Sequence, residues 1–173
     1  AALAAAGGAN VTVFEMRQDR MDEMMALGAN VTALYPYHDV VAHEVASADL
    51  VIGAVLVTGA KAPRVMTREM LVGMEDGSVV VDISIDQGGC FETSRPTSWK
   101  EPTYVEEGVT HFCVTNMPGS VPQTSSQAIC AAILPWVNKL ATGAQWRSND
   151  ALVKGINTEG GRLMHPALQG MEL

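Results

Sequence analysis

The stretch Val79-Val-Val-Asp-Ile-Ser-Ile-Asp-Gln-Gly-Gly-Cys-Phe-Glu92 decides the fold, together with the earlier stretch Gly53-Ala-Val-Leu-Val-Thr-Gly-Ala-Lys-Ala-Pro63. Each reads as an apolar strand that ends in a turn of small residues. Near-continuous apolar runs are typical of parallel strands that are buried on both faces of a sheet. In open α/β sheets, ligands bind just outside the carboxyl ends of the strands. We therefore expect the functional residues among the polar side chains that follow each run.

The bulk composition bounds the class of protein. The chain has 173 residues, of which 47% are hydrophobic and 17% charged, enough for one domain with a real core or one domain plus a short appendage. A net charge of −8 argues against a nucleic-acid partner, and no apolar run approaches the ~20 residues of a membrane span. The three cysteines, Cys90, Cys113 and Cys130, have no paired spacing, which favours a reduced, cytoplasmic protein. The four histidines lie far apart, so no metal site is predicted.

Strands and helices alternate along the chain. Strands are expected at residues 11–15, 31–35, 49–55, 78–85 and 110–115, and helices at 16–27, 39–48, 67–74 and 125–140, with Asp39 and Thr67 as N-caps. This order predicts an α/β fold, a Rossmann-type, doubly wound parallel sheet over residues 1–122. Residues 123–173 are expected to form a C-terminal helical extension, with a short helix from Asn149 and a hairpin through Glu159-Gly160-Gly161 in its tail. The segment 86–108 is predicted to be an irregular binding loop.

The first eight residues, Ala1 to Gly8, read as the end of a helix stopped by glycine. They lead directly into the first predicted strand. In a Rossmann sheet, a strand and a glycine-rich turn precede such a helix. We therefore expect this sequence to be a fragment that lacks the first strand and the glycine loop.

Two carboxylates are candidate ligands. Glu15 ends a strand at the position where Rossmann folds bind ribose hydroxyls, although it is equally compatible with a solvated cap. A carboxylate here favours NAD over NADP, a preference that Arg17 and Arg20 nearby weaken. Asp82, Ser84 and Asp86 alternate at period two, so we expect them to share one face near a strand end. We interpret Asp82 as a structural hydrogen-bond acceptor. Asp86 precedes a flexible Gln-Gly-Gly turn, and we interpret it as a residue that binds a ligand.

Other polar residues follow the strands in the same way. Asn116 offers both a donor and an acceptor to a carboxamide. Arg95 and Lys61 either pair with a pyrophosphate or lie in solvent. Cys90 has no histidine near it in sequence and is interpreted as a bystander.

Three motifs resemble alanine dehydrogenase: residues 53–63, the run Val81-Asp-Ile-Ser-Ile-Asp-Gln-Gly-Gly-Cys-Phe-Glu-Thr-Ser-Arg-Pro-Thr97, and Asn116-Met-Pro-Gly-Ser-Val-Pro122. The resemblance covers nearly the whole chain, and the run from Asp82 to Arg95 is its most specific part. It implies NAD-dependent, reversible deamination of L-alanine to pyruvate and ammonia, and a homo-oligomer, a hexamer in that family. It also implies that residues 123–173 return towards a substrate domain that lies outside this sequence.

The resemblance also implies roles for individual residues. Glu15 holds the adenosine ribose, Arg20 lies near the adenine, and Val55 and Leu56 pack on the cofactor. The rest of the implied NAD site is Ile83, Ser84, Ile85, Asp86, Arg95, Val114, Thr115, Asn116 and Met117. Asp86 is the implied catalytic residue. Glu15 departs from the family, where Asp is usual, and Pro36 stands near a position that is often Ser.

Other functions compete with this interpretation. A transhydrogenase-type NAD(H)-binding domain shares part of the pattern but not the run Asp-Gln-Gly-Gly-Cys-Phe-Glu. A non-catalytic NAD-binding module is a second alternative. A Rossmann-like methyltransferase also has an acidic residue after its second strand, with an antiparallel strand near the end of its sheet, but nothing that corresponds to residues 86–95.

Overall fold

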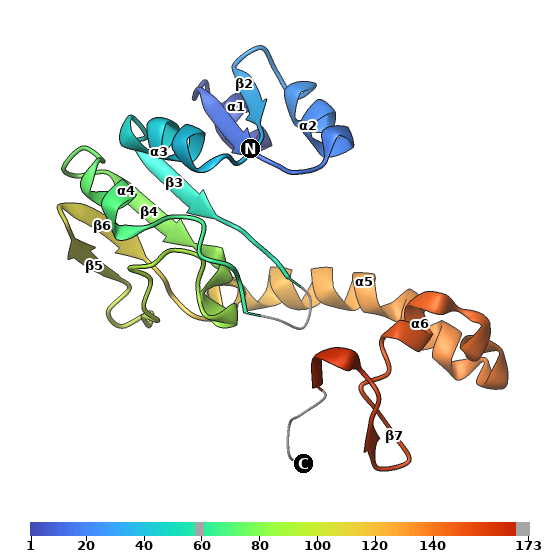
Figure 1. Ribbon diagram of the computed structural model, residues 1–173. Coiled ribbons are helices and arrows are strands. Elements are labelled where there is room, and N and C mark those ends of the chain that lie inside the picture. The colour runs from blue at the N-terminus through green and yellow to red at the C-terminus, as the bar shows by residue number, and fades with distance from the viewer. Residues whose placement is uncertain (58–60, 169–173) are drawn as a thin grey trace.

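Parallel strands and the helices between them make up the first two thirds of the chain (Figure 1). The structure is a computed structural model that describes residues 1–57 and 61–168. The first elements are α1 (Ala2–Ala6), β1 (Val11–Phe14), α2 (Gln18–Met25), β2 (Val31–Leu34), α3 (His38–Ala46), β3 (Leu50–Gly53), α4 (Arg68–Val72) and β4 (Val79–Asp82). The 3₁₀ helix η1 (Ile83–Gln87), β5 (Thr103–Glu106), β6 (Val109–Phe112) and the 3₁₀ helix η2 (Met117–Ser120) follow.

Strands β1 to β6 form two sheets. In one, β1 pairs in parallel with β2, with Val11 opposite Val31. In the other, the order is β3-β4-β6-β5, and β3, β4 and β6 are parallel, so that their carboxyl ends meet at one edge. The predicted fold class, mixed α/β with mainly parallel strands, is confirmed.

The segment 86–108, predicted to be irregular throughout, contains the short helix η1 and the antiparallel strand β5. Strand β5 pairs with β6 through a two-residue turn at Glu107 and Gly108, whose φ angles are 52° and 77°. Hairpin turns of this kind need positive φ at both central residues and normally carry Asn-Gly or Asp-Gly. Glutamate at the first position hides the hairpin from a sequence-based prediction.

Helix ends show how side chains set the boundaries. Thr67 is the predicted N-cap of α4, and its hydroxyl accepts the Met70 N–H at 3.3 Å. The prediction for Asp39 is wrong, because α3 begins at His38 and the cap position is held by Tyr37. Asp39 lies in the first turn, where its charge suits the helix dipole.

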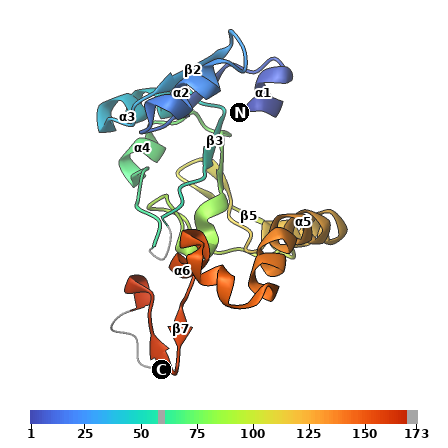
Figure 2. The ribbon, with the colours of Figure 1, turned by 90° about the vertical axis from the view of Figure 1, so that its right-hand side faces the viewer.

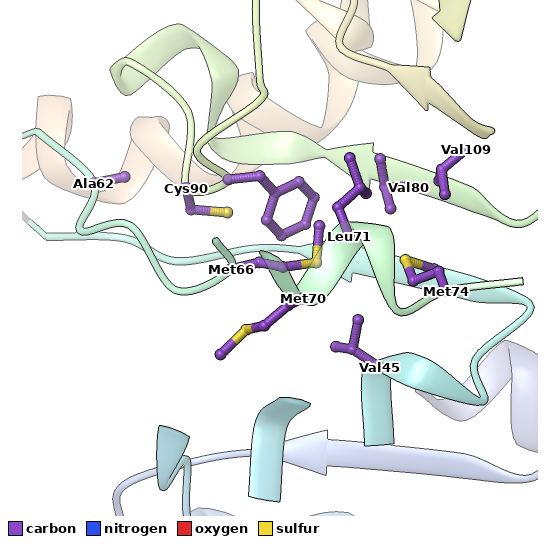
Figure 3. Close-up of a cluster of buried hydrophobic side chains, with 10 residues drawn as sticks. Val45, Ala62, Met66, Met70, Leu71, Met74, Val80, Cys90 and Val109 are labelled. Atoms are coloured by element: carbon purple, nitrogen blue, oxygen red, sulfur yellow. The ribbon is translucent and has the colours of Figure 1, made fainter. Parts of the chain in front are cut away.

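The main core lies between α3, α4 and the four-stranded sheet (Figure 3). Figure 3 shows Leu71 of α4 beside Val80 of β4, and both side chains are fully buried. The buried members are Val45, Ala62, Met66, Met70, Leu71, Met74, Val80, Cys90, Phe91 and Val109. Cys90 and Phe91 belong to the segment that follows β4, so the core holds the base of that segment in place.

The C-terminal part extends away from the sheets on α5 (Pro122–Ala141), as Figure 1 shows. It continues through the 3₁₀ helix Gly143–Ser148, α6 (Asp150–Lys154), the hairpin β7 (Thr158–Glu159) and β8 (Arg162–Leu163), and a final 3₁₀ turn (Pro166–Leu168). In Figure 2, turned by 90°, α6 and β7 lie below the sheets. The predicted short helix and hairpin are confirmed. Helix α5 exposes the large apolar side chains Ile129, Ile133, Leu134, Trp136, Val137 and Leu140. Among the helices of residues 1–57 and 61–168, none is long and apolar enough to cross a membrane.

Candidate active site

Strand β4 ends at Asp82, where the side chain turns the backbone into η1. The Asp82 Oδ1 atom accepts the Ser84 N–H at 2.9 Å, and Gly88 closes η1 with a φ of 91°. The strand predicted over residues 78–85 therefore extends three residues too far at its carboxyl end. Ser84 and Asp86 lie on a 3₁₀ helix, so the expected common strand face of Asp82, Ser84 and Asp86 is not formed.

The Asp82 carboxylate is completely buried and anchors the segment that returns from η1. Its Oδ2 atom accepts the Cys90 N–H at 2.8 Å, the Phe91 N–H at 3.4 Å and the Ser94 hydroxyl at 2.5 Å. This confirms Asp82 as a structural acceptor. Several donors solvate the charge in place of water, as a buried carboxylate requires.

The Cys90 thiol donates to Asp82 Oδ1 at 3.4 Å. Burial, with the charge of Asp82 as a smaller contribution, raises the pKa of Cys90 to about 12. Because thiolates are the reactive form of cysteine, this thiol is not a nucleophile at neutral pH. The interpretation of Cys90 as a bystander in the chemistry agrees with this geometry.

Asp86 and Asn116 come together at the carboxyl edge of the sheet. The Asn116 N–H lies 3.3 Å from Asp86 Oδ1 and 3.2 Å from Oδ2, and both residues are exposed to solvent. Asn116 adopts the left-handed conformation, with φ 50° and ψ 51°, which asparagine tolerates better than most residues. This turn aims its N–H at the carboxylate. Two segments expected to share a site, one after β4 and one after β6, are thus in direct contact.

The segment after β3 joins the same edge. The Ser84 hydroxyl donates to the Val55 carbonyl at 2.8 Å. Leu56 and Ile83 leave 69% and 53% of their surfaces exposed, so they offer an apolar surface to a ligand. Ile85, in contrast, is 3% exposed, and it supports the site from the core side.

Arg95 leads into a segment that runs beside the end of β6. The Thr97 N–H donates to the Cys113 carbonyl at 2.9 Å, and the Thr115 N–H donates to the Thr97 carbonyl at 3.3 Å. Val114 between them is completely buried. The expected cofactor residues Arg95, Val114 and Thr115 therefore lie in neighbouring segments, and Met117, in η2, follows Asn116 directly.

Glu15 and Arg20 lie on the other sheet unit, around β1 and α2. The Glu15 Oε1 atom accepts the Met16 N–H at 2.7 Å and the Arg17 N–H at 3.0 Å, so the carboxylate stabilises the turn before α2. Arg20 pairs with Glu23 at 2.6 Å on the exposed face of α2. Within the described residues, no hydrogen bond or ion pair joins Glu15 or Arg20 to the Asp86 site.

The structure adds contributors that the sequence did not reveal. Tyr104 places its ring 3.8 Å from the Arg95 guanidinium carbon, and Ser94 binds Asp82. A serine in a loop carries no pattern that would have singled it out. Tyr104 alternates with exposed neighbours on β5, a signal of one buried face that only becomes informative once the strand is known. In the described part of the chain, no cluster of His, Cys, Asp and Glu is arranged to hold a metal ion.

Comparison with known proteins assigns the chain to a family. Residues 1–166 match the family model described as alanine dehydrogenase/PNT, C-terminal domain. The alanine dehydrogenases of Halomonas elongata and Mycobacterium tuberculosis are each 44% identical, over 93% and 91% of this chain but only 44% and 43% of their own lengths. The chain thus spans a little under half the length of these curated relatives.

Solved structures agree with the sequence relatives. An L-alanine dehydrogenase superposes with a TM-score of 0.82 at 44% identity, over 96% of this chain and 47% of that chain. A transhydrogenase from Sinorhizobium meliloti superposes with a TM-score of 0.76 at 29% identity, over 96% and 45%. The antiparallel strand β5 would also have suited the methyltransferase alternative, but the match along residues 1–166 excludes that assignment. The chain belongs to the alanine dehydrogenase/PNT C-terminal domain family.

Proposed function

We propose that this chain is the cofactor-binding part of an NAD-dependent alanine dehydrogenase, which converts L-alanine reversibly to pyruvate and ammonia. The observation that carries the proposal is the contact between Asp86 and the Asn116 N–H. It places a solvent-exposed carboxylate at the carboxyl ends of β4 and β6, where open α/β sheets bind their ligands. Both residues lie in motifs that resemble alanine dehydrogenase.

The residues present fit NAD. Glu15 uses Oε1 for the backbone, and Oε2 makes no hydrogen bond within the described residues, so it can accept from ribose hydroxyls. The exposed apolar side chains Leu56 and Ile83 suit the faces of flat rings. Arg95 is an exposed residue, and its guanidinium matches a phosphate in charge and geometry. We include Arg20, Val55, Ser84, Ile85, Val114, Thr115 and Met117 in the proposed site on the strength of the family resemblance.

When bound, NAD accepts the hydride that leaves the α-carbon of alanine. The role of Asp86 follows from the charge that develops at this carbon. The C–N unit of the substrate gains positive character as it becomes an imine, and a carboxylate held beside it stabilises that charge. The Asn116 N–H holds the Asp86 carboxylate in one orientation, so little reorganisation is needed when the charge appears.

Water must then add to the imine before ammonia leaves, which requires an acid–base group. In the resembling family, a histidine has this role, and a lysine and an arginine bind the substrate carboxylate, all in an amino-terminal domain. No residue of this chain is proposed for these three roles. The proposed active site is therefore shared between this chain and a substrate-binding domain.

We also propose that the protein is a cytoplasmic homo-oligomer, a hexamer by the family resemblance. The exposed apolar side chains of α5 support an interface, because they leave a large apolar surface uncovered in the isolated chain. The free thiols of Cys90, Cys113 and Cys130 are compatible with a reducing compartment.

The test measures L-alanine-dependent formation of NADH by absorbance, in the complete protein that carries this chain. We expect Asp86→Ala to lower kcat by about 100-fold or more, the usual cost of removing a stabiliser of developing charge. Asp22→Asn is the matched control, since Asp22 is an exposed carboxylate that contacts only Gln18 on α2 among the described residues. Circular dichroism should stay unchanged in both variants, and NADH binding should stay unchanged in Asp22→Asn.

Near-normal turnover in Asp86→Ala would contradict the proposed role of Asp86. NADH binding by the parent protein without any alanine-dependent reduction of NAD would favour the transhydrogenase-type alternative. The transhydrogenase-type alternative is supported by the structural match to a transhydrogenase at a TM-score of 0.76. That match has 29% sequence identity, compared with 44% for the L-alanine dehydrogenase.

A further inference from the structure

Tyr104 of β5 lies between two planar groups. Its ring stacks on the His111 imidazole, with centroids 4.7 Å apart and planes inclined by 22°. The Arg95 guanidinium carbon lies 3.8 Å from the centroid of the same ring. Two groups so close to one centroid cannot share a face, so Arg95 and His111 lie on opposite faces of the tyrosine. An aromatic face attracts a cation through its quadrupole.

The Tyr104 hydroxyl fixes the backbone of the same loop. It accepts the Arg95 N–H at 3.0 Å and donates to the Thr93 carbonyl at 2.8 Å. Burial raises the pKa of Tyr104, which keeps the hydroxyl protonated and able to donate. One side chain therefore holds both the main chain and the guanidinium of Arg95.

His111 makes the platform rigid and uncharged. Its Nδ1 atom lies 3.0 Å from the Val109 carbonyl, which can only accept, so Nδ1 carries the proton. Its Nε2 atom lies 2.8 Å from the Thr93 hydroxyl and accepts from it. Burial lowers the pKa of His111, so the ring is neutral at pH 7 and does not repel the nearby guanidinium.

Arg95 is a cation without a carboxylate partner among the described residues, so its charge is available to an anionic ligand. In residues 1–57 and 61–168, the ion pairs of arginine involve Arg17, Arg20, Arg68 and Arg147, and no carboxylate pairs with Arg95. A stacked guanidinium keeps the edge with its N–H groups free for bidentate recognition of phosphate.

We propose that Tyr104 is a positioning residue that orients Arg95 toward the diphosphate of a bound dinucleotide. The inference rests on the proposed function, because it takes NAD(H) as the ligand. Tyr104 itself touches no ligand in this proposal. Its effect on binding passes through Arg95, which makes the two residues energetically coupled.

The experiment is a double-mutant cycle on NADH affinity in the complete protein, read by NADH fluorescence. The variants are Tyr104→Leu, Tyr104→Phe, Arg95→Ala and the two double variants. Tyr104→Leu should weaken NADH binding by about 3- to 30-fold, the range of a cation–π contact. Tyr104→Phe keeps the ring and should restore most of this loss. In the Arg95→Ala background, Tyr104→Leu should have no further effect.

A ligand comparison locates the coupled interaction. ADP should follow the NADH pattern, whereas adenosine, which has no phosphate, should bind equally to the parent protein and to every variant. A loss of adenosine affinity in Tyr104→Leu would overturn the proposal in favour of a general structural role. The proposal would also be overturned if Tyr104→Leu weakened NADH binding by the same factor in the parent protein and in the Arg95→Ala variant.

The outcomes separate this proposal from the proposed function. A parent protein that does not bind NADH overturns the proposed function and this inference together. NADH binding by the parent protein with unchanged affinity in Tyr104→Leu overturns only the positioning role. If thermal unfolding shows that Tyr104→Leu does not fold, Arg95→Ala carries the test: it should weaken the binding of NADH and of ADP but not of adenosine, and unchanged NADH affinity in Arg95→Ala would overturn the proposal.

Discussion

Replacing Asp82 by Asn tests whether one buried carboxylate holds the candidate site together. The substitution keeps the shape of the side chain and retains Oδ1, which accepts the Ser84 N–H. It replaces Oδ2 by an NH₂ group, which would face the N–H groups of Cys90 and Phe91, 2.8 and 3.4 Å away. Donors would then oppose donors in a region with no access to water, because Asp82 is 0% exposed.

The magnitude follows from those two amides. A buried donor left without an acceptor costs about 1–3 kcal/mol, so two of them destabilise the folded state by about 2–6 kcal/mol. The Ser94 hydroxyl, now at 2.5 Å from Oδ2, can rotate to accept from the new NH₂ group and adds little to the cost. Since domains are stable by about 5–15 kcal/mol, the change is a large share of the total.

Two measurements check this prediction in the complete protein. Denaturant unfolding should show a lower midpoint, and hydrogen exchange should show faster exchange at the amides of residues 84, 90 and 91 than in the parent protein. Asp22→Asn, on the surface of α2, should change stability by less than about 0.5 kcal/mol. A loss below about 1 kcal/mol in Asp82→Asn, with those amides still protected, would refute the reasoning.

Two further substitutions test the core and a buried histidine. Gly53→Ala would place a Cβ 2.3 Å from Cys90 Sγ and 2.6 Å from Phe91 Cζ, so we expect urea unfolding to show a free energy of unfolding lower by about 1–3 kcal/mol. The control is Gly155→Ala, whose Cβ would meet nothing closer than 3.4 Å and which should leave the stability unchanged or slightly higher. Burial lowers the pKa of His111 in the folded state, so the unfolded state binds more protons at mildly acidic pH. The neutral His111 therefore contributes to the free energy of unfolding above about pH 6.5, and this contribution is lost as the pH falls through the lowered pKa. His111→Asn should flatten this part of the dependence of the melting temperature on pH, and an unchanged slope between pH 7.5 and 5.5 would contradict the assignment.

The regular part of the fold was predictable because its signals are local. Apolar runs located β1 to β4 and β6, and Thr67 marked the start of α4, although the helix ends at Val72 rather than at the predicted residue 74. Strand β5 was missed because the residue at the turn, Glu107, adopts a positive φ that its type rarely shows. The end of β4 was misplaced because the hydrogen bond from Ser84 to Asp82 stops the strand while the apolar pattern continues.

The site was predictable as a set of segments but not as a geometry. The order of the strands brings the residues after β4 and β6 to one edge, which is why Asp86 and Asn116 could each be expected near a ligand, although their contact was not predicted. The orientation of Arg95 could not be predicted, since it depends on a tyrosine nine residues later and on a histidine across the β5–β6 pair. The separations of Arg95, Tyr104 and His111 along the chain match neither the helical nor the strand period, so no sequence pattern indicates that these side chains are in contact.

The Asp82 anchor also constrains how this protein can vary. The segment from Asp82 to Ser94 begins and ends on the same carboxylate, so its length is fixed by a closed ring of hydrogen bonds. An added or deleted residue inside the ring would separate Ser94 from its acceptor, whereas the exposed turn of the β7–β8 hairpin carries no such closure. We therefore expect that residues 82–94 can be exchanged between homologous proteins only as one complete segment, with Asp82 and Ser94 both included.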